Sequence, residues 1–394
     1  MSENAGRVLL DMSCLSDCQC DDALERMFKG LTEAPAKAPN LLWDQVPNPV
    51  LGAMVEEFTR RYQAILDEIQ NHFARFLIGE PIGALQKADV PSWGRWTPDE
   101  MQAVRARLEH RAAADFTLED WMQLVEYLLQ FYFPEDVVLS LADWLAVRAA
   151  FAGKVQAAME ASRPENGVAL AAKLVDFLPT EFGKIPPKIL SPREMDIIRI
   201  ARARAAENIS ALTDVSRHKM KGIIIQHVQA QMLGMKQGTH SALRQALFDE
   251  FGQLNRDFRR IAVTEAGEAC NQGMIASLEP GRKVRRMEAY KGACQFCRSI
   301  NGKVFTIVSP AATEKNGQTE VWVGKTNIGR SAAPRRRGEE GFVARGENEM
   351  WWPAAGLQHP NCRGSWVIVA KEDPRVTPEF TSYMDELLKK HGLS

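Results

Sequence analysis

Two short motifs, Cys294-x2-Cys297 and His359-x2-Cys362, lie far apart in the chain. Two residues between ligands let a tight turn direct both side chains at one ion, and thiolate and imidazole are donors that suit zinc. If both motifs bind the same ion, two distant segments must meet in the fold. Four protein ligands leave no position for water, which is typical of a structural zinc site. The competing interpretation is that these are reduced core cysteines and a hydrogen-bonded histidine.

The remaining cysteines carry a weaker signal. The chain has seven cysteines, an odd number, and this favours free thiols and metal ligands over a disulfide framework in a reducing compartment. Cys14, Cys18 and Cys20 have no histidine nearby, so we expect ordinary thiols there.

Helical periodicity dominates the first two thirds of the chain. With 394 residues, 45% apolar and 25% charged, the composition is that of a folded chain of two or three domains. Apolar residues recur at spacings of three and four from Leu51 to Leu77, which predicts an amphipathic helix. N-cap patterns at Thr97, Thr117 and Ser140 predict three shorter helices.

The pattern changes toward the C-terminus. Ser191, Pro192 and Glu194 form a capping box that begins another helix, and a further helix is expected from about Ser241 to Ala276. The segments GKVFTIV and SWVIVA are short and rich in β-branched residues, so they predict strands. Thr377 begins a terminal helix. The predicted fold class is mainly α with a small C-terminal β-containing zinc knob, an α+β arrangement.

These patterns divide the chain into five predicted segments. They are an extended acidic arm at 1–50, an N-terminal helical domain at 51–185, a helical core at 190–281, a β-containing zinc-knob region at 282–371 and a C-terminal helix at 372–394. The knob region contains a basic loop at 309–349.

The charge is balanced overall but not locally. The chain has 49 basic and 50 acidic residues, whereas residues 282–345 contain 14 Lys or Arg against five Glu. A flexible basic loop suits phosphate backbones, and an acidic protein surface is the alternative partner. Residues 1–44 carry eight acids against four bases. The candidate binding residues of the basic loop are Arg330, Arg335, Arg336, Arg337 and Arg345.

A catalytic constellation is not evident. Glu265 and Glu268 lie three apart on a predicted helix, a spacing that more often marks a solvated face. No Ser-His-Asp order, nucleophile elbow or Walker loop is found, so we predict a protein that is not an enzyme. No apolar window of membrane-spanning length and no secretory signal are visible, and we expect the chain to stay in the cytoplasm of the cell that makes it.

Several motifs between Ser191 and Ala370 occur in a specific order. Together they resemble the phage Mu F-like head morphogenesis, or minor head, protein family, with Val263 where the family carries an arginine. The segment 190–281 would be the MuF-like core. The motif residues are Thr264, Glu265, Asn271, Gly273, Cys294, Cys297, Asn301, Gly302, Lys303, Phe305, His359, Pro360, Cys362 and Arg363.

The resemblance implies a structural minor head protein of a tailed bacteriophage, located inside the head near the portal. The implied partners are the portal protein and packaged double-stranded DNA, with a major capsid or scaffold protein and a second copy of the chain as further candidates, and no membrane. The implied roles are head morphogenesis and, as an open further role, genome ejection. Two alternatives remain: a zinc-dependent nuclease or transferase using Glu265 or Glu268, and a stand-alone DNA-binding zinc module.

Overall fold

The computed structural model describes most of the chain. The described residues are 46–77, 95–108, 115–163, 165–186, 188–325, 335–336, 342–343, 353–369 and 377–393; for some of them, including 70–77 and the two short strands at 335–336 and 342–343, only the backbone is described. The predicted acidic arm up to residue 45 and most of the predicted basic loop after Lys325 lie outside the described residues.

The described chain forms two compact units. The first combines the residues up to Phe58 with Leu141–Asn208 and the residues from Arg259 onward, and the second combines Thr59–Ser140 with Ile209–Phe258. Four helices, α3 (Pro49–Leu77), α6 (Glu135–Ser162), α8 (Pro192–Met232) and α9 (His240–Ala276), therefore contribute residues to both units.

The first unit has a helical core in which α6 (Glu135–Ser162) approaches α9 closely. A Cβ atom at Gly153 would overlap the backbone carbonyl of Cys270, and one at Gly273 would overlap that of Ala150. Two glycines thus allow the two helix backbones to touch, which no larger side chain would permit. The unit also contains α7 (Gly167–Leu174) and α11 (Pro378–Lys390).

The second unit is built from helices alone among its described residues. It contains α4 (Pro98–Leu108), α5 (Leu118–Tyr132) and parts of α3, α6, α8 and α9. Its interior includes a charged group: Glu126 is fully buried and forms ion pairs with Arg217 and Lys221. Such a buried acid is tolerated because both charges around it compensate its loss of hydration.

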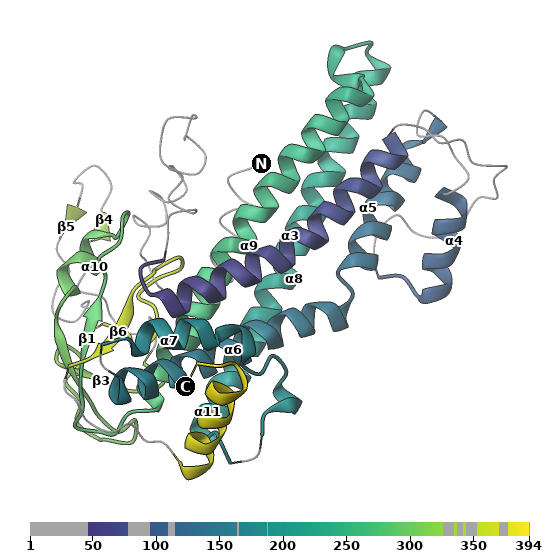
Figure 1. Cartoon of the computed structure of the whole chain (residues 1–394). Helices are drawn as coiled ribbons and strands as arrows, with labels where there is room; N and C mark the ends of the chain where they lie inside the picture. The colour runs from purple at the N-terminus through teal and green to yellow at the C-terminus, as the bar shows by residue number, and fades with distance from the viewer. Residues whose placement is uncertain are drawn as a thin grey trace. The chain divides into compact units, whose positions relative to one another are not determined.

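A four-stranded mixed sheet completes the first unit (Figure 1). The strand order is β3-β2-β1-β6, with β1–β2 and β1–β6 antiparallel and β2–β3 parallel. One face covers an apolar cluster in which the rings of Phe305 and Trp366 meet edge to face at 5.5 Å. The bounds are β1 (Lys283–Met287), β2 (Val304–Ile307), β3 (Glu320–Val321) and β6 (Ser365–Ile368); β4 (Arg335–Arg336) pairs separately with β5 (Phe342–Val343).

The structure confirms the predicted fold class, a mainly helical chain with a small β-containing knob near the C-terminus. Capping hydrogen bonds are present at Thr117, Ser191 and Thr377, as predicted. The predicted helix start at Ser140 is wrong, because α6 already begins at Glu135 and continues through that position. Strand β1 and the short helix α10 (Gln295–Ile300) were not predicted.

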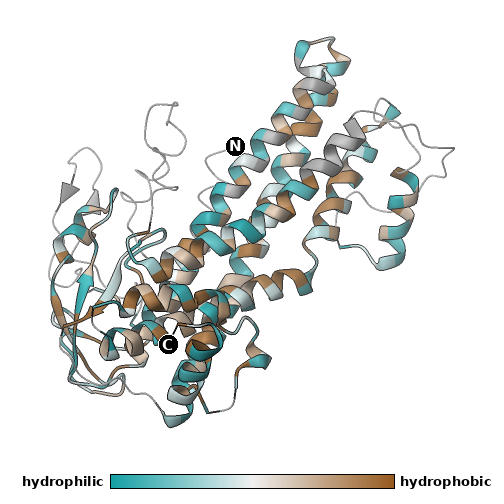
Figure 2. Ribbon diagram, viewed as in Figure 1, coloured by the Kyte–Doolittle hydropathy of each residue, from teal (hydrophilic) through white to brown (hydrophobic). Residues whose placement is uncertain are grey.

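Hydrophilic and hydrophobic residues alternate along the long helices, as expected for helices with one buried face (Figure 2). On α3 the buried side includes Met54, Phe58, Tyr62 and Leu66, all fully buried. Among the described helices, none is both long and apolar enough to cross a membrane.

Candidate metal centre

The first two candidate ligands lie at the start of α10. Cys294 is the N-cap of this helix, and its Sγ accepts a hydrogen bond from the backbone N–H of Cys297 at 3.4 Å. The sulfur thus takes the place that a serine or threonine oxygen usually has at a helix start. Cys297, one turn further on, is buried, and both sulfurs lie on the same side of the helix start.

The other two candidate ligands lie in the loop that precedes β6. His359 and Cys362 are brought together by a tight turn, in which the N–H of Cys362 donates to the carbonyl of His359 at 3.1 Å. Asn361 has a φ of +60° in this turn, a conformation that asparagine tolerates better than most residues.

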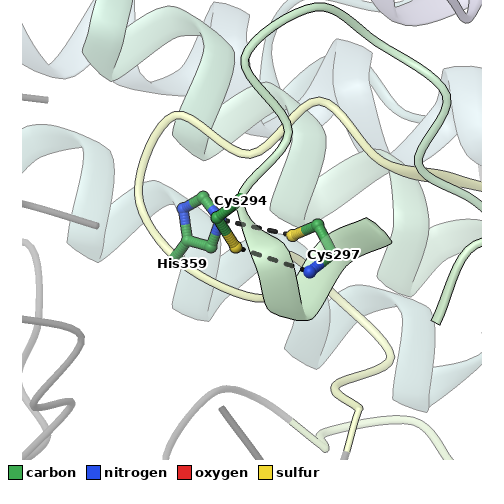
Figure 3. A group of neighbouring side chains, drawn as sticks. All are labelled: Cys294, Cys297 and His359. Carbon is green, nitrogen blue, oxygen red and sulfur yellow. Dashed lines mark hydrogen bonds between the residues drawn. The ribbon is translucent and has the colours of Figure 1, made fainter. Parts of the chain in front are cut away.

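The two segments meet around the His359 ring (Figure 3). Its Nε2 lies 3.5 Å from Cys294 Sγ and 3.3 Å from Cys297 Sγ. Its Nδ1 lies 2.9 Å from the carbonyl oxygen of Pro360, which turns Nε2 toward the sulfurs. Cys362 belongs to an overlapping group with Cys297 and Glu288, and within each group the ligand atoms lie within 4.8 Å of one another. The four predicted ligands therefore form one cluster that can hold a metal ion.

Two of the three cysteines in the cluster favour the thiolate, whereas hydrogen bonds to Cys294 and Cys362, together with burial, raise the pKa of Cys297 well above its ordinary value. Hydrogen bonds from Cys297 and His359 lower the pKa of the Cys294 thiol to about 4. Burial lowers the pKa of His359, but its hydrogen bond to Cys294 and the thiolate charges outweigh this and raise the pKa to about 10. Although burial opposes ionisation, hydrogen bonding from Cys297 and the positive charge of His359 hold the pKa of Cys362 well below its ordinary value. A metal cation would displace the protons held by His359 and Cys297, because a ligand must be deprotonated to bind it.

A buried ion pair lies beside Cys362. The Nε of Arg286 donates to Glu288 Oε1 at 2.7 Å, and its Nη2 lies 3.8 Å from Cys362 Sγ. The guanidinium also donates to the carbonyl of Gly356 at 3.1 Å and stacks over the ring of Trp366. Arg286 thus supplies positive charge next to a thiolate in a site without solvent contact.

Arg286 and Glu288 were not recognised in the sequence. Strand β1 alternates exposed and buried residues, which places Val284 and Arg286 on the buried side. The same alternation, continued by two residues, places Glu288 beside Arg286, whereas nothing in the local sequence identifies the distant partner Cys362.

The structure corrects the expectation for the two acids of α9. Glu265 and Glu268 are buried, 1% and 7% exposed, and do not form a solvated face. Glu265 accepts hydrogen bonds from Arg204 at 3.3 Å and Asn208 at 3.0 Å. Burial raises the pKa of Glu265, and the charge of Arg204 opposes this increase. Neither acid belongs to a potential metal-binding group among the described residues.

The remaining motif residues surround the cluster. Asn301 caps the end of α10, and its Oδ1 accepts from the N–H of Glu288 at 2.8 Å. Gly302 follows with a φ of +78°, so the chain can turn from α10 into β2. The carbonyl of Lys303 accepts from the N–H of Arg286, and Arg363 is buried. The motif therefore joins α10, β1 and β2.

The predicted basic binding residues are not part of this cluster as described. Arg330, Arg337 and Arg345 lie outside the described residues, and for Arg335 and Arg336 only the backbone of strand β4 is described. Nucleic-acid binding by this loop stays a prediction.

Comparisons of the chain with protein-family models, curated proteins and solved structures found no match.

Proposed function

We propose that Cys294, Cys297, His359 and Cys362 bind one zinc ion in a structural role. The convergence of these four side chains from two distant segments carries the proposal. Three sulfurs and one imidazole nitrogen are donors that zinc prefers, and four such ligands close a tetrahedral site. The ion would fasten α10 to the loop before β6.

The metal content of the full chain, purified without chelator, tests this role. We expect one zinc per chain, lost in the double variant Cys294→Ser/Cys297→Ser. Cys270→Ala is the matched control, because Cys270 is also a buried thiol but burial raises its pKa to about 12 and it belongs to neither potential metal-binding group. A wild-type chain without bound metal, or a double variant with unchanged metal content, would contradict the proposal.

We further propose that this metal-stapled chain is a minor head protein of a tailed bacteriophage, which joins the portal during head assembly and contacts packaged DNA. The support is the ordered set of motifs from Thr264 to Arg363, together with a site whose ligand set suits a structural rather than a hydrolytic metal. The local excess of basic residues between 282 and 345 supports the DNA contact.

Co-expression with the portal protein encoded in the same genome tests this assignment. We expect a stable complex, and binding to duplex DNA that weakens steeply with salt and is reduced when Arg335, Arg336 and Arg337 become Ala. Absence of portal binding would contradict the head assignment without affecting the metal role. Metal-dependent turnover abolished by Glu265→Gln would instead support the enzymatic alternative.

A further inference from the structure

One face of α9 presents three polar side chains to the loop that carries His359 and Cys362. Thr264, Glu268 and Asn271 lie at positions i, i+4 and i+7, a spacing that aligns side chains on one helix face. All three are buried, with 8%, 7% and 3% of their surface exposed. Polar side chains that are buried together need partners, and these find them in the backbone of the loop.

Each of the three bonds a different backbone group of that loop. The Oε2 of Glu268 accepts from the N–H of Leu357 at 2.6 Å, and the Oγ1 of Thr264 accepts from the N–H of Asn361 at 2.9 Å. The Nδ2 of Asn271 donates to the carbonyl of Gly364 at 2.9 Å. The contacts thus lie before, between and after the two ligands.

Of the three contacts, the one made by Glu268 has the least space around it. A Cβ atom at Gly356 would overlap the Glu268 carboxylate, so the loop passes directly over this side chain. Gln272 donates to Glu268 Oε1 at 3.2 Å and also to the carbonyl of Lys325 at 3.2 Å, which supports the carboxylate from its own helix. Arg204 of α8 lies 3.9 Å away and supplies a compensating charge.

We propose that Thr264, Glu268 and Asn271 are positioning residues of the metal centre, which hold the His359–Cys362 turn in its binding conformation before the ion arrives. This inference depends on the metal-binding role proposed above. A loop that is already ordered loses less conformational entropy when it binds, so these residues raise metal affinity without touching the ion. Outer-shell partners of this kind typically change metal affinity about 10- to 100-fold.

The test compares metal affinities of full-length variants. Zn²⁺ affinity is measured by competition with a chromophoric chelator, and Co²⁺ serves as a spectroscopic probe of the thiolate ligands. We expect Glu268→Ala to weaken Zn²⁺ binding by about 10-fold or more and to alter the Co²⁺ spectrum. Glu268→Gln keeps an oxygen acceptor for the Leu357 N–H but places its amide nitrogen against the Nε2 of Gln272, so it should restore only part of the affinity.

Glu250→Ala is the matched control for a general loss of stability. Glu250 is a buried acid of the same helix, 5% exposed, and pairs with Lys219 in the second unit. We expect this variant to bind Zn²⁺ like the wild type. Equal affinities for Glu268→Ala and Glu250→Ala would overturn the positioning role.

A second α9 variant and the metal binding of the wild type distinguish the positioning role from the metal-binding role. Thr264→Val preserves the shape of the side chain and removes only the acceptor of the Asn361 N–H. This variant is used in place of Glu268→Ala if Glu268→Ala does not fold. Unchanged Zn²⁺ affinity in the valine variant would then overturn the proposal. Absence of Zn²⁺ and Co²⁺ binding in the wild type would overturn the metal-binding role itself. Tight binding by the wild type with no effect in the α9 variants would overturn only the positioning role.

Discussion

Glu160 of α6 accepts a hydrogen bond from the backbone N–H of Ile368 in β6, at 3.1 Å. Four residues earlier on the same helix, Gln156 donates to the carbonyl of Trp366 at 3.3 Å. Strand β6 lies at the edge of the sheet, so these backbone groups have no strand partner among the described residues. Two side chains of α6 therefore cover an edge that would otherwise be open to pairing with another chain.

This contact predicts a pH-dependent stability. Burial raises the pKa of Glu160 from its ordinary 4.5 to about 7, against the opposing effect of its hydrogen bonds. Between these values the folded chain binds more protons than the unfolded chain, so the free energy of unfolding falls as pH rises through this window. We expect Glu160→Gln to remove this decrease in the free energy of unfolding. Since one pKa unit corresponds to about 1.4 kcal/mol, the decrease is of the order of 2 kcal/mol. Urea unfolding at pH 5 and pH 8 measures the difference for the wild type and for Glu160→Gln. The same pH dependence in the two proteins would disprove the role of Glu160.

The helix crossing in the first unit predicts opposite effects for two sets of glycines. Gly153→Ala and Gly273→Ala would press a methyl group into the backbone of the facing helix, so we expect each to destabilise the chain by about 2 kcal/mol or more. Gly222 of α8 and Gly252 of α9 have open space at the Cβ position. Alanine there should stabilise the helices by about 0.5–1 kcal/mol. Thermal unfolding of the four variants separates the two classes, and similar effects in all four would refute the close approach.

The four candidate ligands were predictable because their spacing is a local property of the sequence. Cys294 and Cys297 need one turn, His359 and Cys362 need another, and the chemistry of sulfur and imidazole indicates the kind of ligand. The capping residue Ser191 was predictable for the same reason, since its partner Glu194 lies three positions away. Ser140 carries the same signal, but it lies inside α6 because helical residues continue on both sides of it.

Features that depend on tertiary packing were not predictable. Two acids three positions apart on a helix have the same sequence pattern whether they face water or a loop. The burial of Glu265 and Glu268 could therefore not be inferred from their spacing. The contact of Arg286 with Cys362, 76 positions away, depends on which segments meet in the fold, and periodicity does not specify that. Likewise, the division of four helices between two units follows from packing rather than from any local boundary signal.

The buried charge of the second unit predicts a large cost for removing one partner. Glu126 is bonded by Arg217 and Lys221, and Lys221 is itself 1% exposed. In Glu126→Leu the lysine would remain buried beside an apolar side chain, so we expect a loss of about 3 kcal/mol in unfolding free energy. The double variant Glu126→Leu/Lys221→Met should recover most of this loss, because it removes the two fully buried charges and leaves the partly exposed Arg217 paired with Asp214. Denaturant unfolding of the two single variants and the double variant measures how strongly Glu126 and Lys221 depend on each other. If the changes in unfolding free energy of the single variants simply add up in the double variant, the prediction is wrong.

Metal removal is expected to loosen α10 and the ligand loop while the sheet stays folded. The apolar cluster around the ligands is small, with Ala293 and Leu357 as its buried residues apart from the cysteines, whereas the sheet covers a much larger cluster. Without the ion, little apolar burial remains to hold α10 against the loop. Chelation should therefore increase amide hydrogen exchange in 294–300 and 357–362, with little change in β1, β2 and β6. Equal increases throughout residues 283–368 would show instead that the ion supports the whole knob, and no increase would show that the ion does not fasten α10 to the loop.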